Sequence, residues 1–281
     1  MEKFELALEE YRKEIEKGIV GVLSRAPKNL RDSVGHIIVG GKRLRPIMVL
    51  ASCEAAGGEI KKAVGGGVGI ELIHTFSLVH DDIMDRSEER RGRKCVHVEF
   101  GTSTAILAGD LLEAIGLELM GRDGLSEKGT ELTKRICEGQ KMDIDFESKE
   151  IKDEEYFRMI ELKTAYTFKC AAEVGAILGG GEESVVEKLG VYGMNFGMAF
   201  QIGDDIADTF SSGSSDDLEA GKKTMPVVSG WSFEDALTKG DDLMKRYSER
   251  ALDSISELEE SRGKDVLVAL AQRYGRVGGF I

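Results

Sequence analysis

Proline is scarce in this chain of 281 residues, and so are the features of a secreted or membrane-spanning protein. Only three prolines occur, Pro27, Pro46 and Pro226, so long helices can form without interruption. No uninterrupted apolar run of about eighteen residues is present, and the opening Met1-Glu2-Lys3-Phe4 lacks the apolar core of a signal peptide. We therefore expect a cytoplasmic protein that inserts no segment into a membrane.

Cysteine and basic charge are limited as well. The four cysteines, Cys53, Cys95, Cys137 and Cys170, stand apart without a C-x-x-C pair or a histidine at zinc-ligand spacing. We interpret them as reduced thiols in the core. The net charge of −13 and pI near 5.0 argue against nucleic acid as a partner, because nucleic-acid-binding surfaces are basic.

Apolar residues at helical spacing are abundant. Hydrophobic residues make up 41% of the chain, and few windows alternate with the period of a strand. The pattern predicts an all-α fold with shorter helices after Pro226 and long helices at about 60–87, 102–121, 126–148, 154–179 and 183–210. No linker or repeat divides the chain, so we expect one domain over residues 1–281.

Other segments are consistent with this helical pattern. Phe4, Leu8, Tyr11 and Ile15 form the apolar stripe of a first helix, and Pro46 suits the first turn of another that runs to about residue 56. The glycine-rich segment 65–69 follows no strand and lacks a downstream Gly-Lys-Ser/Thr, so we favour a flexible or closely packed helical segment over a phosphate-binding loop.

The strongest chemical signal is a pair of aspartate pentads, Asp81-Asp82-Ile83-Met84-Asp85 and Asp204-Asp205-Ile206-Ala207-Asp208, each near the end of an apolar helix. The first and last aspartates of a pentad lie on one helix face, one turn apart. A single acidic pentad is more often a solvated helix face. Two copies in apolar surroundings favour a site for Mg²⁺, which binds one or two carboxylates together with substrate phosphate oxygens.

The two pentads resemble the aspartate-rich motifs of the trans-isoprenyl diphosphate synthases, the polyprenyl synthetase family, in particular archaeal-type short-chain geranylgeranyl and farnesyl diphosphate synthases. Further segments resemble other motifs of that family in the same order: Gly41-Lys42-Arg43-Leu44-Arg45-Pro46, Glu71-Leu72-Ile73-His74, Arg90-Arg91-Gly92, Gly109-Asp110, Gly139-Gln140, Lys163-Thr164 and Gly221-Lys222-Lys223-Thr224. The resemblance implies an isoprenoid synthase fold, a single bundle of about ten or more helices around a central active-site cavity.

The resemblance also implies a reaction and its substrates. The expected activity is the Mg²⁺-dependent head-to-tail condensation of isopentenyl diphosphate with an allylic diphosphate, by a prenyltransferase that forms a homodimer. About three Mg²⁺ ions would bind in each active site. The implied metal ligands are Asp81, Asp82, Asp85, Asp204 and Asp208.

The remaining implied roles concern the two diphosphates. Isopentenyl diphosphate would be bound by Lys42, Arg45, His74 and Arg91, and the allylic diphosphate by Arg90, Lys163, Thr164, Gln201 and Lys222. Arginine suits bidentate phosphate contacts and lysine supplies a point charge. The residues expected to be catalytic are Asp81, Asp85, Lys163 and Asp204.

Residues just upstream of the first pentad limit product length in this family. Phe76 and Ser77 occupy these positions, which implies a geranylgeranyl product with Phe76 as the floor of the pocket, although helix geometry places Ser77 nearer the face of Asp81. The loop Ser211-Ser212-Gly213-Ser214-Ser215 lacks a lysine that the family usually carries there. The alternatives are a farnesyl diphosphate synthase, a catalytically weak regulatory subunit of a heteromeric synthase, and an acidic scaffold that only accumulates divalent ions. The second pentad argues against a terpene cyclase.

Overall fold

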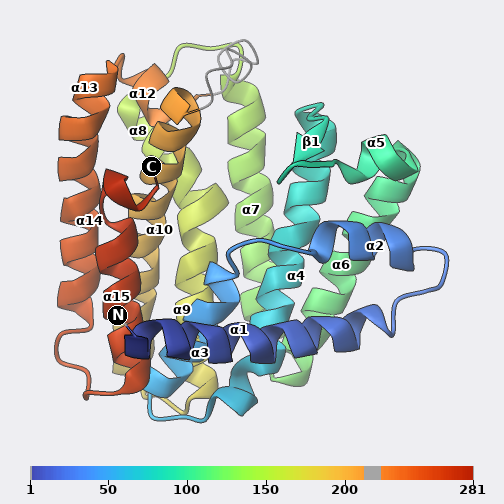
Figure 1. Ribbon diagram of the computed structural model, residues 1–281, viewed down its shortest axis with the longest axis horizontal. Helices are drawn as coiled ribbons and strands as arrows, with labels where there is room; N and C mark the ends of the chain where they lie inside the picture. Colours follow the sequence, from blue (N-terminus) through green and yellow to red (C-terminus); the bar gives the residue numbers. More distant parts are fainter. Residues whose placement is uncertain (1, 212–222, 281) are drawn as a thin grey trace.

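The computed structural model describes residues 2–211 and 223–280, and its long helices run side by side in one bundle (Figure 1). The helices of this bundle are α4 (Ile60–Met84), α6 (Thr102–Arg122), α7 (Ser126–Phe146), α9 (Tyr166–Leu178), α10 (Glu183–Ser211), α14 (Asp241–Ser254) and α15 (Arg262–Tyr274). The expected all-α bundle of more than ten helices is confirmed in the described residues. The predicted helix over 60–87 ends at Met84, and the other long helices lie within a few residues of their predicted bounds.

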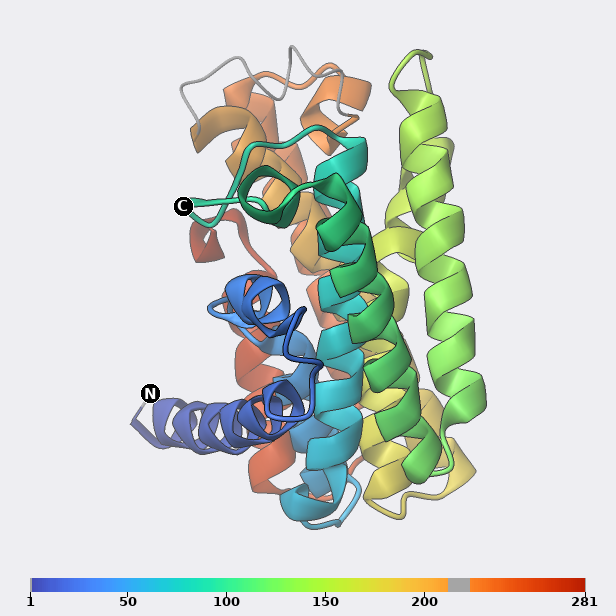
Figure 2. The same cartoon turned by 90° about the vertical axis from the view of Figure 1, so that its right-hand side faces the viewer.

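The long helix α1 and several shorter helices cross or close this bundle. They are α1 (Glu2–Leu23), α2 (Arg31–Ile38), α3 (Leu44–Ala55), α5 (Val96–Phe100), α8 (Asp153–Ile160), α12 (Met225–Val228), α13 (Phe233–Asp235) and the 3₁₀ turn η3 (Val277–Gly279). Figures 1 and 2 show α1 lying across the long helices on one face. The predicted stripe on α1 explains this packing, because Tyr11 and Ile15 are fully buried.

The glycine-rich segment is a closely packed part of α4. A Cβ atom at Gly66 would lie 2.8 Å from the Leu178 side chain, and one at Gly69 would lie 2.9 Å from that of Met120. Each glycine in a helix costs about 1 kcal/mol relative to alanine, and here the close contacts of α4 with α9 and α6 offset this cost. Close packing, one of the two helical readings, is therefore confirmed for this segment.

The sequence pattern missed two local features near the site. Residues 89–94 form a hairpin of β1 (Glu89–Arg90) and β2 (Arg93–Lys94), whose turn residues Arg91 and Gly92 have φ of 55° and 69°. Two successive positive φ angles are typical of a type I′ turn. The predicted helix over 154–179 is interrupted by a π-helical turn, η1 (Glu161–Ala165), between α8 and α9, and a second π-helical turn, η2 (Ala236–Gly240), precedes α14.

The prediction for the cysteines was wrong at one position. Cys53, Cys95 and Cys170 are buried, but Cys137 is exposed on α7, because it follows the buried Ile136 and points about 100° away from it on the helix. All four are free thiols. Within residues 2–211 and 223–280, no helix combines the length and apolar character needed to span a bilayer.

Candidate active site

One large cavity of about 840 Å³ lies between the ends of α4 and α10 that carry the pentads. Its lining includes Asp81 and Asp85 from the first pentad and Asp204, Asp205 and Asp208 from the second. Further lining residues with predicted roles are Lys42, Arg45, His74, Ser77, Arg90, Arg91, Lys163, Thr164 and Gln201. The fold therefore brings nearly all of the predicted site residues to one cavity.

Asp82 is the exception within the first pentad. It is 1% exposed, does not line the cavity, and its Oδ1 accepts hydrogen bonds from Arg90 Nε at 2.8 Å and is 2.7 Å from Arg90 Nη2. Successive residues on a helix point about 100° apart, so α4 turns Asp82 away from the face shared by Asp81 and Asp85. Asp82 holds Arg90, and its position does not suit it to bind a metal in the cavity.

Burial shapes the electrostatics of both pentads. Desolvation raises the pKa of Asp81 even though Lys163 lies close to it, and desolvation also raises the pKa of Asp204 despite the nearby charges of Lys42 and Arg45. Asp81 also lies in the last turn of α4, where the helix dipole disfavours negative charge. Cations bound in the cavity would favour the ionised forms of both carboxylates.

The donor set fits Mg²⁺ bound together with a diphosphate. In the described part of the chain, no group of three or more His, Cys, Asp or Glu side chains is arranged to hold an ion by itself. Mg²⁺ takes one or two carboxylates and completes its octahedron with water and phosphate oxygens. Asp81, Asp85, Asp204 and Asp208 offer oxygen ligands from two sides of the cavity without forming a closed cage.

Asp205 connects the second pentad to the surrounding helices. Its Oδ2 accepts hydrogen bonds from the Tyr156 hydroxyl at 2.6 Å and from the Met225 backbone N–H at 3.0 Å, and its Oδ1 accepts one from Gln201 Nε2 at 2.6 Å. Burial nevertheless raises the pKa of Asp205 to about 7. The Oε1 of Gln201 accepts a hydrogen bond from the Thr164 hydroxyl at 2.7 Å. This polar chain fixes the orientation of the Gln201 amide.

The basic side chains of Lys42, Arg43 and Arg45 approach the cavity from the start of α3 and the loop before it. Arg43 is buried with φ of 54° and donates to Glu16 and Glu71, both at 2.7 Å. Arg45 donates through Nε to the Thr167 hydroxyl at 2.8 Å. Desolvation lowers the pKa of Arg45 to about 10, so it remains a cation at neutral pH. Arg43 thus anchors the loop, while Lys42 and Arg45 reach the cavity.

The hairpin brings the side chain of Arg91 against the segment that carries Lys42 and Arg43. A Cβ atom at Gly41 would lie 2.8 Å from Arg91 Nη1, so the guanidinium of Arg91 rests on the backbone of that segment. His74 lies nearby, and desolvation followed by the charges of Arg45 and Arg91 lowers its pKa well below the ordinary value. His74 is therefore a neutral donor or acceptor among several arginines.

Lys163 enters the cavity from the π-helical turn η1. Its ammonium lies 2.6 Å from Asp143 Oδ2 and 3.4 Å from Asp81 Oδ2. Burial alone would lower the pKa of Lys163, but the carboxylates of Asp81 and Asp143 outweigh it and raise the pKa. Lys163 therefore stays charged and connects α7 to the first pentad.

Two glycines set the position of η1. A Cβ atom at Gly139 on α7 would lie 2.5 Å from the backbone nitrogen of Lys163, and one at Gly197 on α10 would lie 2.5 Å from the Cα of Ala165. Real Cβ atoms do not approach so closely. The turn is thus packed against the backbones of two helices, which explains why a glycine stands beside Gln140 in the sequence.

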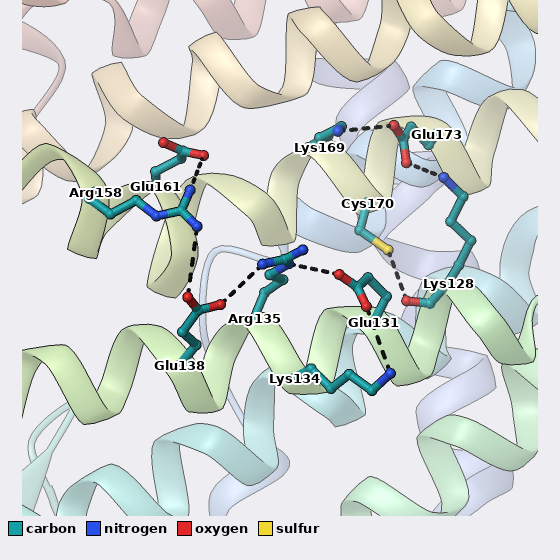
Figure 3. Close-up of polar contacts among 10 residues, drawn as sticks. All are labelled: Lys128, Glu131, Lys134, Arg135, Glu138, Arg158, Glu161, Lys169, Cys170 and Glu173. Atoms are coloured by element: carbon teal, nitrogen blue, oxygen red, sulfur yellow. Dashed lines mark hydrogen bonds and ion pairs between the residues drawn. The ribbon is translucent and has the colours of Figure 1, made fainter.

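Ion pairs cover the outer side of the same interface (Figure 3). Arg158 lies 3.8 Å from Glu138 of α7 and 2.9 Å from Glu161, and Lys169 lies 3.7 Å from Glu173. Exposed pairs of this kind contribute about 0–1 kcal/mol each. The close backbone contact at Gly139 therefore decides the separation of α7 and η1 more than these pairs do.

The two chain-length candidates occupy different environments. Ser77 lines the cavity, together with the apolar side chains of Leu78, Ile136, Met159 and Ile160. Phe76 is buried, does not line the cavity, and packs edge-on against His80 with ring centroids 5.7 Å apart. The apolar lining is suited to a prenyl chain, and Ser77 is the candidate that faces it.

Some predicted residues lie outside the described part of the chain, and some residues of the site were not predicted. Lys222 and the loop positions 212–215 lie outside the described residues. Asp143, Tyr156 and Glu71 were given no role, although Asp143 lies seven residues, about two helical turns, after Ile136, and both line the cavity. An aspartate at that spacing, one turn after Gly139, was the available signal for Asp143.

Comparisons with known proteins identify the family. The model of the family described as "Polyprenyl synthetase" matches residues 27–260. The short chain isoprenyl diphosphate synthase of Methanothermobacter thermautotrophicus is 44% identical over 217 residues, which are 72% of this chain and 67% of that protein. The geranylgeranyl diphosphate synthase of Methanosarcina mazei is 38% identical over 225 residues, 73% of this chain and 68% of that one.

Solved structures give the same result. The geranylgeranyl pyrophosphate synthetase from the archaeon Geoglobus acetivorans superposes with a TM-score of 0.87 at 34% identity, covering 95% of this chain and 98% of that one. The fold is therefore that of an all-helical prenyltransferase. Within this class, the chain belongs to the polyprenyl synthetase family.

Proposed function

We propose that the protein condenses isopentenyl diphosphate with an allylic diphosphate to give a short-chain all-trans prenyl diphosphate, geranylgeranyl diphosphate in the first place. The observation that carries this proposal is the meeting of carboxylates from both pentads and cationic side chains around one cavity with an apolar part. The names of the archaeal relatives support the choice of a twenty-carbon product over farnesyl diphosphate. The regulatory-subunit alternative predicts only weak turnover, and the scaffold alternative predicts none.

Asp81, Asp85, Asp204 and Asp208 would hold magnesium, on which members of this family depend. When bound with the allylic diphosphate, about three Mg²⁺ ions would act as Lewis acids that stabilise charge on the leaving oxygens. Lys163, Arg90, Thr164 and Gln201 would surround the same diphosphate. Lys222 is kept in this set on the family resemblance alone.

Lys42, Arg45, His74 and Arg91 would bind the diphosphate of isopentenyl diphosphate without a metal. The allylic carbon–oxygen bond breaks with its electron pair on the diphosphate oxygen, and the double bond of isopentenyl diphosphate attacks the allylic carbon. The proton then lost from the new chain passes to an oxygen of the departing diphosphate. The chain's task is to orient both esters, exclude water and stabilise the released charge.

The growing prenyl chain would extend along the apolar lining past Ser77. Phe76 stays the proposed floor on the family resemblance; its ring is buried and does not line the cavity. Phe76→Ala should then give longer products than the wild type. Products of unchanged length would overturn this role for Phe76 without affecting the proposed activity.

The test is an assay of the purified protein with labelled isopentenyl diphosphate, Mg²⁺ and dimethylallyl, geranyl or farnesyl diphosphate in turn. We expect consumption of both esters and a geranylgeranyl product by mass spectrometry. Asp204→Asn should abolish most turnover, whereas Asp242→Asn, an exposed aspartate on α14, should retain it. Failure to consume isopentenyl diphosphate with any starter would overturn the proposal, and accumulation of farnesyl diphosphate would correct the product.

A homodimer in the cytoplasm is part of the same proposal and rests on the family resemblance. Light scattering of the purified protein measures the oligomer directly. A mass of twice 30.7 kDa is expected, and a monomer that turns over substrate at the wild-type rate would contradict it.

A further inference from the structure

The ammonium of Lys42 lies over three aromatic rings. Lys42 Nζ is 5.5 Å from the ring centroid of Phe200, 5.6 Å from that of Tyr274 and 5.5 Å from that of Phe280. All three distances are within the range of about 6 Å for an attractive cation–π contact. The cation is therefore shared by three rings from three separate segments.

The three rings also contact one another. Their centroids are 5.6 Å apart for Phe200 and Tyr274, 5.4 Å for Phe200 and Phe280, and 5.4 Å for Tyr274 and Phe280. Phe200 comes from α10, Tyr274 ends α15 and Phe280 follows η3. The four centres form a nearly regular tetrahedron, so we call Phe200, Tyr274 and Phe280 the aromatic triad.

Close packing fixes Phe280 in this triad. A Cβ atom at Gly203 would lie 2.4 Å from the Phe280 ring, so the ring rests on the backbone of α10 immediately before Asp204. In Figure 1 the segment after α15 turns back alongside α10. The triad thus packs against α10 immediately before the second pentad begins at Asp204.

Aromatic rings and carboxylates can both hold a lysine ammonium, but they differ in whether its N–H groups stay available to a phosphate. A carboxylate partner would neutralise the ammonium and occupy its protons, whereas aromatic faces attract the cation and leave its N–H groups free to donate to phosphate oxygens. Lys42 is a flexible side chain on an exposed loop, and restraining it before the ligand arrives reduces the entropic cost of binding.

Only part of the triad belongs to the cavity wall. Phe200 and Lys42 line the cavity, but Tyr274 and Phe280 do not. These two rings therefore act on a substrate through Lys42 and Phe200, not by direct contact.

We propose that Tyr274 and Phe280 are positioning residues that, together with Phe200, hold the Lys42 ammonium in place to bind the diphosphate of isopentenyl diphosphate. This inference rests on the proposed role of Lys42 in binding that substrate. It assigns the segment after α15 a part in substrate affinity.

The test separates affinity for the two substrates. Phe280→Leu should raise the KM for isopentenyl diphosphate about threefold to tenfold, while kcat and the KM for the allylic diphosphate stay within about twofold. Phe280→Tyr, which keeps an aromatic ring of nearly the same size, should retain the wild-type KM, and stepwise fluorination of the Phe280 ring should raise it progressively. Phe100→Leu is the matched control, because Phe100 is also partly buried against the core but does not line the cavity.

A double-mutant cycle decides between positioning and simple packing. If the triad acts through the lysine, Phe280→Leu should have no further effect on the KM for isopentenyl diphosphate in a Lys42→Gln background. An unchanged KM in Phe280→Leu, or an equal effect with and without Lys42, would overturn the inference while the synthase activity stands. An unchanged KM in Lys42→Gln would instead overturn the proposed role of Lys42.

Discussion

Lys163 and Asp81 form an ion pair in the wall of the cavity, with the lysine Nζ 3.4 Å from the aspartate Oδ2. Asp143 holds the same ammonium at 2.6 Å, so the lysine is shared between a proposed metal ligand and a carboxylate on α7. The stronger contact is the one to Asp143. This arrangement keeps a positive charge at the first pentad and leaves Asp81 oxygens available to a metal.

Removal of the Asp143 charge tests this division. In Asp143→Asn the ammonium would turn to the first pentad, where the charges of Asp81 and Asp85 also act on it, and compete with Mg²⁺ there. We expect the Mg²⁺ concentration for half-maximal activity to rise roughly tenfold, the equivalent of about 1.4 kcal/mol. Asp145→Asn, which removes a half-buried carboxylate paired with Lys141 on the same helix, should leave it unchanged. An unchanged requirement in Asp143→Asn would contradict the proposed competition.

Asp81 and Asp82 should respond differently to the same substitution. Asp82→Asn breaks a buried pair with Arg90, and losing one partner of such a pair costs about 3–5 kcal/mol of the free energy of unfolding. Asp81→Asn should cost little stability, since it removes a carboxylate that is already disfavoured by desolvation, but it should weaken Mg²⁺ binding. Urea unfolding and Mg²⁺ titration of activity measure the two effects. If both variants raised the Mg²⁺ concentration needed for half-maximal activity equally, Asp82 would be a metal ligand as the sequence predicted.

Gly139→Ala should displace the π-helical turn that carries Lys163 and Thr164. The added methyl group overlaps backbone atoms that cannot move aside as a side-chain end could, and such overpacking costs about 1–3 kcal/mol of stability. We expect kcat to fall by at least about tenfold with the KM for isopentenyl diphosphate nearly unchanged. Gly21→Ala is the control, because a Cβ atom there would meet nothing within 4 Å. Wild-type kcat in Gly139→Ala would show that η1 tolerates displacement.

The raised pKa values of Asp81 and Asp204 predict how metal binding depends on pH. Both groups become protonated at a higher pH than ordinary aspartates, and a protonated carboxyl binds Mg²⁺ poorly. Activity at fixed low Mg²⁺ should therefore fall as the pH drops, beginning above the ordinary value of about 3.9. Because protons and metal compete, excess Mg²⁺ should move this loss to lower pH. Rates measured between about pH 5 and pH 8 at two Mg²⁺ concentrations test this prediction. A loss of activity at low pH that does not change with the Mg²⁺ concentration would contradict it.

Much of the fold could be predicted from local patterns. Apolar spacing over α4, α6, α7 and α10 repeats with the helical period for many turns, so type and approximate bounds followed directly. The hairpin at residues 89–94 and the turn η1 could not be predicted in this way. Each is too short for a periodic signal, and each is held by contacts with distant segments, such as that of Gly139 with Lys163.

The sequence by itself determined that α4 and α10 are apolar helices with aspartates one turn apart, because helical geometry depends only on neighbouring residues. It also determined which short basic segments were available to meet an anion. Only the tertiary structure decided that Asp82 pairs with Arg90, that Asp143 shares Lys163 with Asp81, and that three rings surround Lys42. These contacts join residues from 8 to 238 positions apart in the chain, and chain folding alone brings such residues together.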